Sequence, residues 1–199
     1  MWISADSEKI RYTGRIDWSV PKEPPWIFPC TSSEFKFTGN TLKIHVKNKN
    51  EYWQNYLGCI LDNVQSRFYI KKEGETKIEV RVNENETGVH HVLFFKRQDS
   101  CHEVTILGYE IEDGEKLLEL PKKTDKRIEV YGDSVSAGEV SEAVDFVGKE
   151  DPEHEGGYSN SYYSYGWILA RKLGAQIHDI AQGGIALMDG EGWYHEYKA

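Results

Sequence analysis

The pattern of the sequence changes near residue 124, and this change constrains the fold more than any other feature. Before it, short runs of alternating or β-branched residues are separated by turn-forming segments; after it, the order becomes strand, connection, helix, strand. The first pattern is typical of an antiparallel sandwich or barrel, and the second of a parallel sheet with a right-handed crossover. We therefore expect two domains, residues 1–124 and residues 125–199.

Six strands are expected in the first part, with turn signals such as TGN, KEGE and NENETG between them. They are expected at residues 34–39, 41–48, 67–72, 77–82, 90–98 and 103–111. A proline-rich segment, residues 21–29, precedes them. Because proline cannot donate to a strand ladder, we expect this segment to be an arm along a sheet edge.

The second part is expected to begin with a strand at residues 128–132 and to continue, after a connection, with a helix and a buried strand at residues 175–181. Apolar residues at helical spacing define that helix: Tyr163, Trp167, Leu169, Ala170 and Leu173. Ser159, Asn160 or Ser161 could cap its start, and Gly174 ends it. An open parallel sheet usually has about four to six strands. We therefore expect that the chain is a fragment or that the missing strands come from elsewhere.

Charge and hydropathy exclude several classes of partner. A formal net charge of −9 disfavours binding to nucleic acid. No apolar run is long enough to cross a membrane, and the first residues lack the features of a signal peptide. As it stands the sequence favours the cytoplasm, and a secreted location would require that a leader had been removed. Three widely spaced cysteines, Cys30, Cys59 and Cys101, are expected to be buried free thiols.

Gly132, Asp133 and Ser134 follow a β-branched run at the start of the α/β pattern. Reactive groups in open parallel sheets sit just beyond the carboxyl ends of the strands, so Ser134 is a candidate nucleophile. Alternatively, its hydroxyl only caps the next helical turn. Neighbouring strand residues point in opposite directions, so Asp133 is expected to hold the turn by binding backbone amides.

Four segments together resemble carbohydrate esterase family 2, in which a jelly-roll sandwich precedes an SGNH (GDSL-type) hydrolase domain. They are residues 15–44, 88–111, 126–140 (KRIEVYGDSVSAGEV) and 179–190 (DIAQGGIALMDG). The resemblance implies an all-β jelly-roll sandwich followed by the N-terminal part of an α/β hydrolase domain of flavodoxin-like type. The chain would then end before the C-terminal part of that domain.

The resemblance also assigns roles to individual residues. Ser134 would be the nucleophile and an oxyanion donor through its N–H, and Gly184 would be a second oxyanion donor, with Gly183 as the alternative register. The family's Asn block and late Asp-x-x-His do not follow Gly184 in this sequence. Asp151-Pro-Glu-His154 spells the same pattern but lies too early in the chain, and His195 is a similarly weak candidate.

The implied activity is that of a serine esterase that removes O-acetyl groups from plant polysaccharides such as xylan or glucomannan. The implied partner is an acetylated carbohydrate, without nucleic acid or membrane, and no metal or organic cofactor is implied. Trp193 could stack on a sugar ring, although burial would explain it equally well. His90 and His91 point to opposite faces of one strand, so they are not expected to bind one metal ion together.

Two alternatives remain at this point: a carbohydrate-binding sandwich without hydrolysis, and an inactive fragment. We expect little or no esterase activity from the 199 residues alone, because no general base is assigned. We also expect self-association, or disorder near the C-terminus, unless a further segment completes the sheet.

Overall fold

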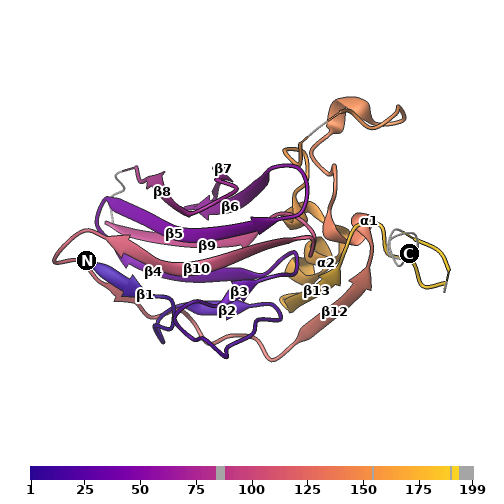
Figure 1. The fold of residues 1–199 in the computed structure, drawn as a ribbon. Coiled ribbons are helices and arrows are strands. Elements are labelled where there is room, and N and C mark those ends of the chain that lie inside the picture. The colour runs from indigo at the N-terminus through magenta and orange to yellow at the C-terminus, as the bar shows by residue number, and fades with distance from the viewer. Residues whose placement is uncertain (84–87, 154, 189, 193–199) are drawn as a thin grey trace.

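Two antiparallel sheets face each other in the first part of the chain (Figure 1). The computed structural model describes residues 1–83, 88–153, 155–188 and 190–192. The first sheet has the order β1 (Trp2–Ser4), β10 (His102–Ile111), β5 (Thr41–Asn50) and β8 (Glu75–Arg81), and β3 (Pro25–Trp26) also pairs with β10.

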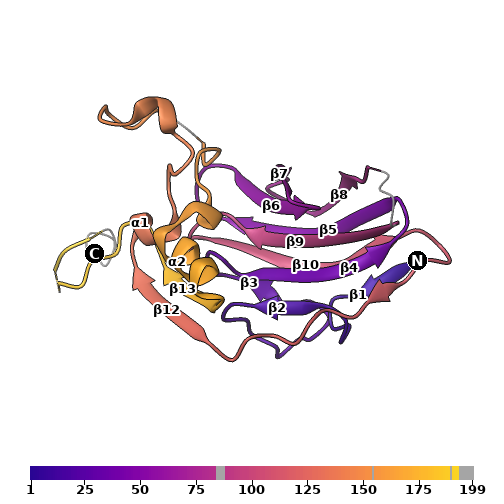
Figure 2. The same ribbon diagram turned by 180° about the vertical axis from the view of Figure 1, so that it is seen from behind.

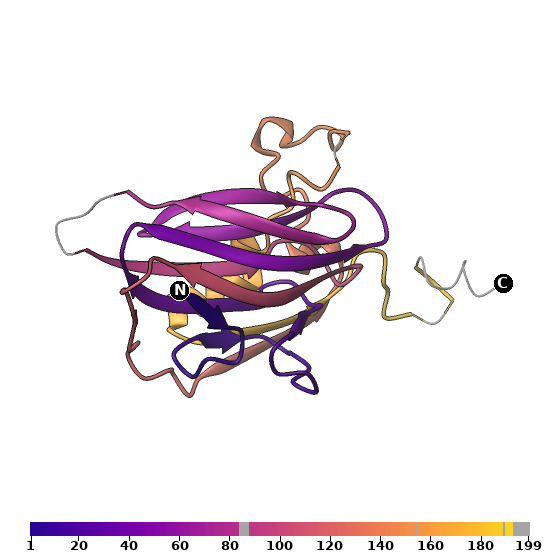
Figure 3. The same cartoon turned by 60° about the vertical axis from the view of Figure 1, so that its left-hand side comes forward.

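The second sheet has the order β11 (Leu117–Leu118), β4 (Ser32–Thr38), β9 (Val89–Lys96), β6 (Asn55–Leu61) and β7 (Val64–Ile70), and β2 (Arg11–Thr13) pairs with β4. Figure 3, turned so that the N-terminal end comes forward, shows the stacked strands of the sandwich. The prediction of a β-sandwich is therefore confirmed, and all six expected strands are present within a few residues of their predicted bounds.

The core of the sandwich is apolar because the strands alternate in their burial. In β8, every second residue is buried and the others face solvent. Aromatic rings fill the centre. The ring of Phe35 packs edge-on against that of Tyr109, with centroids 5.1 Å apart, and its centroid lies 6.4 Å from that of Phe94. The proline-rich arm lies along β10 as predicted, and the side chain of its Trp26 is completely buried.

Strand β6 was not among the predicted strands. Its sequence, NYLGCIL, is interrupted by Gly58, a residue that is depleted in strands. The structure explains the glycine, because a Cβ at this position would overlap the ring of Phe95 on the neighbouring strand β9. The close approach of the Phe95 ring therefore requires glycine at position 58. The same glycine weakens the strand pattern in the sequence, so the strand was not predicted.

The second part of the chain lies at the end of the sandwich opposite the N-terminus (Figures 1 and 2). Its elements are β12 (Arg127–Gly132), α1 (Ser134–Ala137), the 3-10 turns η1 (Val144–Phe146) and η2 (Ser161–Tyr163), α2 (Tyr165–Leu173) and β13 (Gln176–Ala181). Strands β12 and β13 are parallel, as the strand–helix–strand pattern predicted.

The predicted single helix is two elements. Asn160 caps the 3-10 turn η2, and the extended backbone of Ser164 then interrupts the helix before α2 begins. Ser164 is therefore the cap of α2, and the prediction of a cap at residues 159–161 was wrong for that helix. Trp167 and Ala170 are buried as expected, whereas Leu169 and Leu173 are exposed because they lie away from the packed side of α2.

Several smaller predictions can be compared with the structure. None of the three cysteines forms a disulfide; Cys30 and Cys59 are buried, while Cys101 is only partly buried. His90 is buried and His91 is exposed, in agreement with their predicted opposite faces. Among the described residues, no helix is long and apolar enough to cross a membrane. The boundary at residue 124 and the completion of the sheet by association or another segment stay predictions.

Candidate active site

Ser134 lies where strand β12 ends and the short helix α1 begins. Asp133 is the cap of this helix, and its Oδ1 accepts the N–H of Val135 at 3.0 Å. The predicted role of Asp133 in the turn is therefore confirmed. Since Asp133 is the cap, capping does not explain Ser134, whose half-buried side chain lines a cavity.

The two glycines that follow β13 have different environments. Gln182 N–H donates to the carbonyl of Gly132 at 3.1 Å, so the ends of β12 and β13 are held together. Gly183 is buried, and its N–H donates to Asp99 Oδ2 at 2.7 Å. Gly184 is exposed and has a φ of +75°, a conformation that favours glycine.

A cavity of about 410 Å³ opens at this edge of the small sheet. It is lined by Ser134, Glu139, Gly183, Gly184, Tyr52 and Trp53. The structure thus brings together Ser134 and the predicted glycine pair, which are 50 residues apart in sequence. Glu139, Tyr52 and Trp53 were missed by the sequence reasoning. The one available signal for the last two was an aromatic pair in an otherwise polar turn, NEYWQN.

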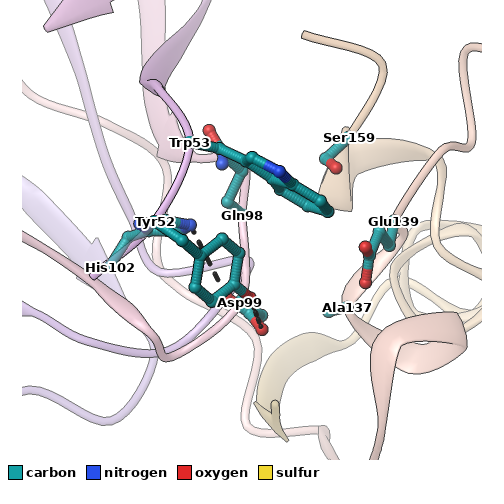
Figure 4. A pocket seen from close by; sticks show the side chains of 8 residues that line it. All are labelled: Tyr52, Trp53, Gln98, Asp99, His102, Ala137, Glu139 and Ser159. Atoms are coloured by element: carbon teal, nitrogen blue, oxygen red, sulfur yellow. Dashed lines mark hydrogen bonds and ion pairs between the residues drawn. The ribbon is translucent and has the colours of Figure 1, made fainter. Parts of the chain in front are cut away.

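Asp99 connects the sandwich to this site. It lies in the loop between β9 and β10, and its Oδ2 accepts the Tyr52 hydroxyl at 3.1 Å as well as the Gly183 N–H. Its Oδ1 accepts the N–H of Cys101 at 3.2 Å. Figure 4 shows Asp99 and Tyr52 beside a small pocket, with Glu139 on the opposite side. One carboxylate of the sandwich therefore fixes the glycine loop of the second part.

Comparison with known proteins identifies the family. The family model for the N-terminal domain of carbohydrate esterase 2 matches residues 12–121, which is more than half of the chain. The chain belongs to carbohydrate esterase family 2. The resemblance seen in the sequence is thereby confirmed.

Two curated relatives of this family 2 chain cover nearly all of it. Cellulase/esterase CelE of Acetivibrio thermocellus is 32% identical over 183 residues, which are 92% of this chain and 21% of that protein. An acetylxylan esterase / glucomannan deacetylase of Cellvibrio japonicus is 26% identical over 186 residues, which are 94% of this chain and 50% of that protein. The chain spans half the length of the curated relatives it matches, or less.

Solved structures of family 2 esterases have the same fold. The one from Clostridium thermocellum in complex with cellohexaose has a TM-score of 0.79 at 29% identity, and covers 89% of this chain and 52% of its own. The one from Cellvibrio japonicus has a TM-score of 0.83 at 22% identity, and covers 98% of this chain and 55% of its own. The fold expected for the family, a sandwich followed by an α/β part, is therefore confirmed.

Burial sets the protonation of several groups around the site. Burial, with the charges of Asp99, Asp151 and Asp133, raises the pKa of Glu139. Burial lowers the pKa of Lys96 to about 7, against the opposing effect of Asp99. Burial and the charge of Lys96 lower the pKa of His102 to about 4. His102 is therefore a neutral imidazole near pH 7 and remains buried in the wall of the small cavity of Figure 4.

The Lys-Arg pair at the end of β9 belongs to the same junction. Lys96 Nζ donates to the carbonyls of Gln98, at 2.6 Å, and Asp99. The Arg97 side chain, 1% exposed, pairs with Glu142 at 2.6 Å. Lys96 therefore holds the shape of the loop that carries Asp99, and Arg97 ties this loop to the second part of the chain.

Of the remaining candidates, only Asp151 is among the described residues. Asp151 lies outside the lining of the large cavity. His154, Trp193 and His195 lie outside the described residues. Within the described part of the chain, no group of three or more His, Cys, Asp or Glu residues is arranged to hold a metal ion.

Proposed function

We propose that this family 2 chain carries the nucleophile of a serine esterase that removes O-acetyl groups from carbohydrates such as xylan or glucomannan. One observation carries the proposal: Ser134 and Gly184 line the same cavity, at the ends of two paired parallel strands. The names of the relatives, an acetylxylan esterase / glucomannan deacetylase and a cellulase/esterase, support the substrate class. Ester hydrolysis at such a site requires a nucleophile and donors for the developing oxyanion.

In the proposed reaction, Ser134 Oγ attacks the carbonyl carbon of the acetyl ester and loses its proton to a general base. The N–H groups of Ser134 and Gly184 donate to the resulting oxyanion. The intermediate then breaks its bond to the sugar oxygen, which takes up the proton and leaves as a free hydroxyl. Water attacks the acetyl-serine in the same way, and acetate is released.

The structure supports Gly184 over Gly183 as the second oxyanion donor. The N–H of Gly183 already donates to the buried carboxylate of Asp99 at 2.7 Å, so it cannot also point at the substrate. Gly184 is exposed and lines the cavity, and it has no side chain of its own that would limit the approach of the substrate to its N–H.

No histidine is among the described residues that line the cavity, so the general base stays unassigned. The family resemblance assigns it to a histidine in a late Asp-x-x-His block, which residues 185–199 do not contain. The 199 residues alone are therefore expected to have little or no esterase activity, because a serine without a base is a weak nucleophile.

The proposal is tested by acetate release from acetylated xylan and glucomannan oligosaccharides by the protein in its full-length form. Ser134→Ala is expected to lower kcat/KM at least about a thousandfold, since the variant has no nucleophile. Ser136→Ala is the matched control, because Ser136 lies in the same short helix but its hydroxyl contacts Tyr165 Oη at 2.8 Å.

Hydrolysis that survives the Ser134 change would refute the assignment of the nucleophile. Glycan binding without any acetate release would instead favour a carbohydrate-binding function. Equal losses in both serine variants would point to a folding defect rather than to catalysis.

A further inference from the structure

The sandwich presents a large aromatic side chain at the cavity that contains Ser134. Trp53 lies in the turn between β5 and β6, lines this cavity, and is 41% exposed. In Figure 4 its indole extends from the sandwich side toward Ser159 and Glu139. The second part of the chain supplies Ser134, so the cavity has a reactive wall and an aromatic wall from different parts of the molecule.

The backbone around Trp53 is held in an unfavourable conformation. Trp53 has a φ of +50°, which is rare for a bulky residue. The Asn50 side chain stabilises it, since Nδ2 donates to the Trp53 carbonyl at 2.6 Å and to the Tyr52 carbonyl at 3.2 Å. Such strain is found preferentially where a binding site requires one particular geometry.

Tyr52 supports the Trp53 side chain. The ring of Tyr52 packs edge-on against it, with centroids 4.9 Å apart and an angle of 89° between the planes. Tyr52 is fixed in turn by its hydrogen bond to Asp99 and by its contact with the ring of His102 at 4.9 Å. The indole is therefore positioned before any ligand arrives, which lowers the entropic cost of binding.

We propose that Trp53 is a platform for the sugar ring whose acetyl group reaches Ser134. The C–H faces of a pyranose pack well on an aromatic ring, and an uncharged surface suits a neutral glycan. Glu139, on the opposite wall, offers acceptors for sugar hydroxyls. This inference rests on the proposed function, and it assigns part of the substrate specificity to the sandwich.

The test compares Trp53→Ala with Trp18→Ala in the full-length protein. Trp18 is a matched control, because it is 42% exposed and packs against Tyr12, and it does not line this cavity. The measured quantity is kcat/KM for acetylated xylo-oligosaccharides divided by kcat/KM for 4-nitrophenyl acetate. Trp53→Ala is expected to lower this ratio about tenfold, mainly through KM, and Trp53→Phe to restore part of it.

A ratio that does not change in Trp53→Ala would overturn the proposal, as would an equal fall in Trp18→Ala. A second measurement does not depend on catalysis: calorimetric titration of the Ser134→Ala background with the acetylated oligosaccharide. Loss of binding on adding Trp53→Ala, and not on adding Trp18→Ala, supports the platform even if no ester is hydrolysed. Equal binding in all three proteins refutes it, whatever the outcome for the esterase.

Discussion

The interior of the sandwich and the junction between the two parts of the chain are built differently. The interior is a continuous apolar cluster in which Phe35, Phe94 and Tyr109 are fully buried. The junction has a smaller apolar cluster around Phe95 and Trp167, and beside it lie the buried polar groups of Lys96, Arg97, Asp99 and Asp179.

This difference in composition suggests that the two regions have different roles, one in the stability of the fold and one in the positioning of the site. Apolar burial is non-directional, so many arrangements of the interior would have similar free energy. A buried polar group instead requires a partner at one distance and angle. We infer that the interior stabilises the fold and that the junction places the glycine loop relative to Ser134.

The largest expected effect is that of a cavity in the sandwich interior. Phe35→Ala should lower the free energy of unfolding by about 3 to 5 kcal/mol, because a completely buried ring is lost. Urea unfolding followed by tryptophan fluorescence measures it. The control is Phe146→Ala, because this ring in the largely exposed η1 segment is only half-buried, and the expected loss is below about 1 kcal/mol. Similar losses of unfolding free energy in the two variants would contradict the inference that the sandwich interior is the main source of stability.

A change in the junction should affect catalysis more than folding. In Asp99→Asn an NH2 group replaces one carboxylate oxygen, so it must face either the N–H of Cys101 or both the N–H of Gly183 and the hydroxyl of Tyr52. If Asp99 positions the glycine loop, kcat for the acetylated oligosaccharide falls about tenfold with little change in KM.

The control is Glu51→Gln, which changes an exposed side chain in the neighbouring turn between β5 and β6. It should leave kcat unaltered. Thermal unfolding of both variants serves as the structural check. A loss of stability in Asp99→Asn with an unchanged kcat would mean that Asp99 only supports the fold.

The smallest expected effect is a change in the pH dependence of stability. Burial raises the pKa of Asp179 to about 7, although a hydrogen bond from Cys30 opposes this shift. Between about pH 4 and pH 7 the folded chain therefore holds a proton that the unfolded chain has lost, so stability falls as the pH rises through this window.

Asp179→Asn removes that titration. Relative to the native chain, the variant should gain on the order of 1 kcal/mol between pH 5 and pH 8. Urea unfolding at pH 5, 6, 7 and 8 measures the difference. Parallel stability curves for the two proteins would show that Asp179 does not titrate in this range.

The sequence allowed prediction of features that are local in the chain. The strands alternate in burial, and Ser134 and Gly184 each lie within three residues of the end of a strand, so a short window of sequence is enough to single them out as candidates. Spacing identifies Leu169 and Leu173 as part of a helix, but it does not tell which residues a neighbouring element covers, and both are exposed.

The other residues of the candidate site could not be predicted in this way. Asp99, Tyr52 and Trp53 come from two loops of the sandwich, and their relation to Gly183 exists only after folding. Before that, Asp99 resembles any acidic residue in a polar turn. Pairings between distant segments are set by topology, and a single sequence contains no record of them.

The order of the chain has a consequence for the polar junction during synthesis. Arg97 pairs with a residue 45 positions later, Ser161 donates to a carbonyl 65 positions earlier, and Ser100 donates to a residue 82 positions later. On the ribosome, the sandwich strands are complete before any of these partners emerges. We expect the nascent sandwich to close around its aromatic residues while Lys96 and Arg97 stay hydrated, and to exclude that water only when β13 arrives.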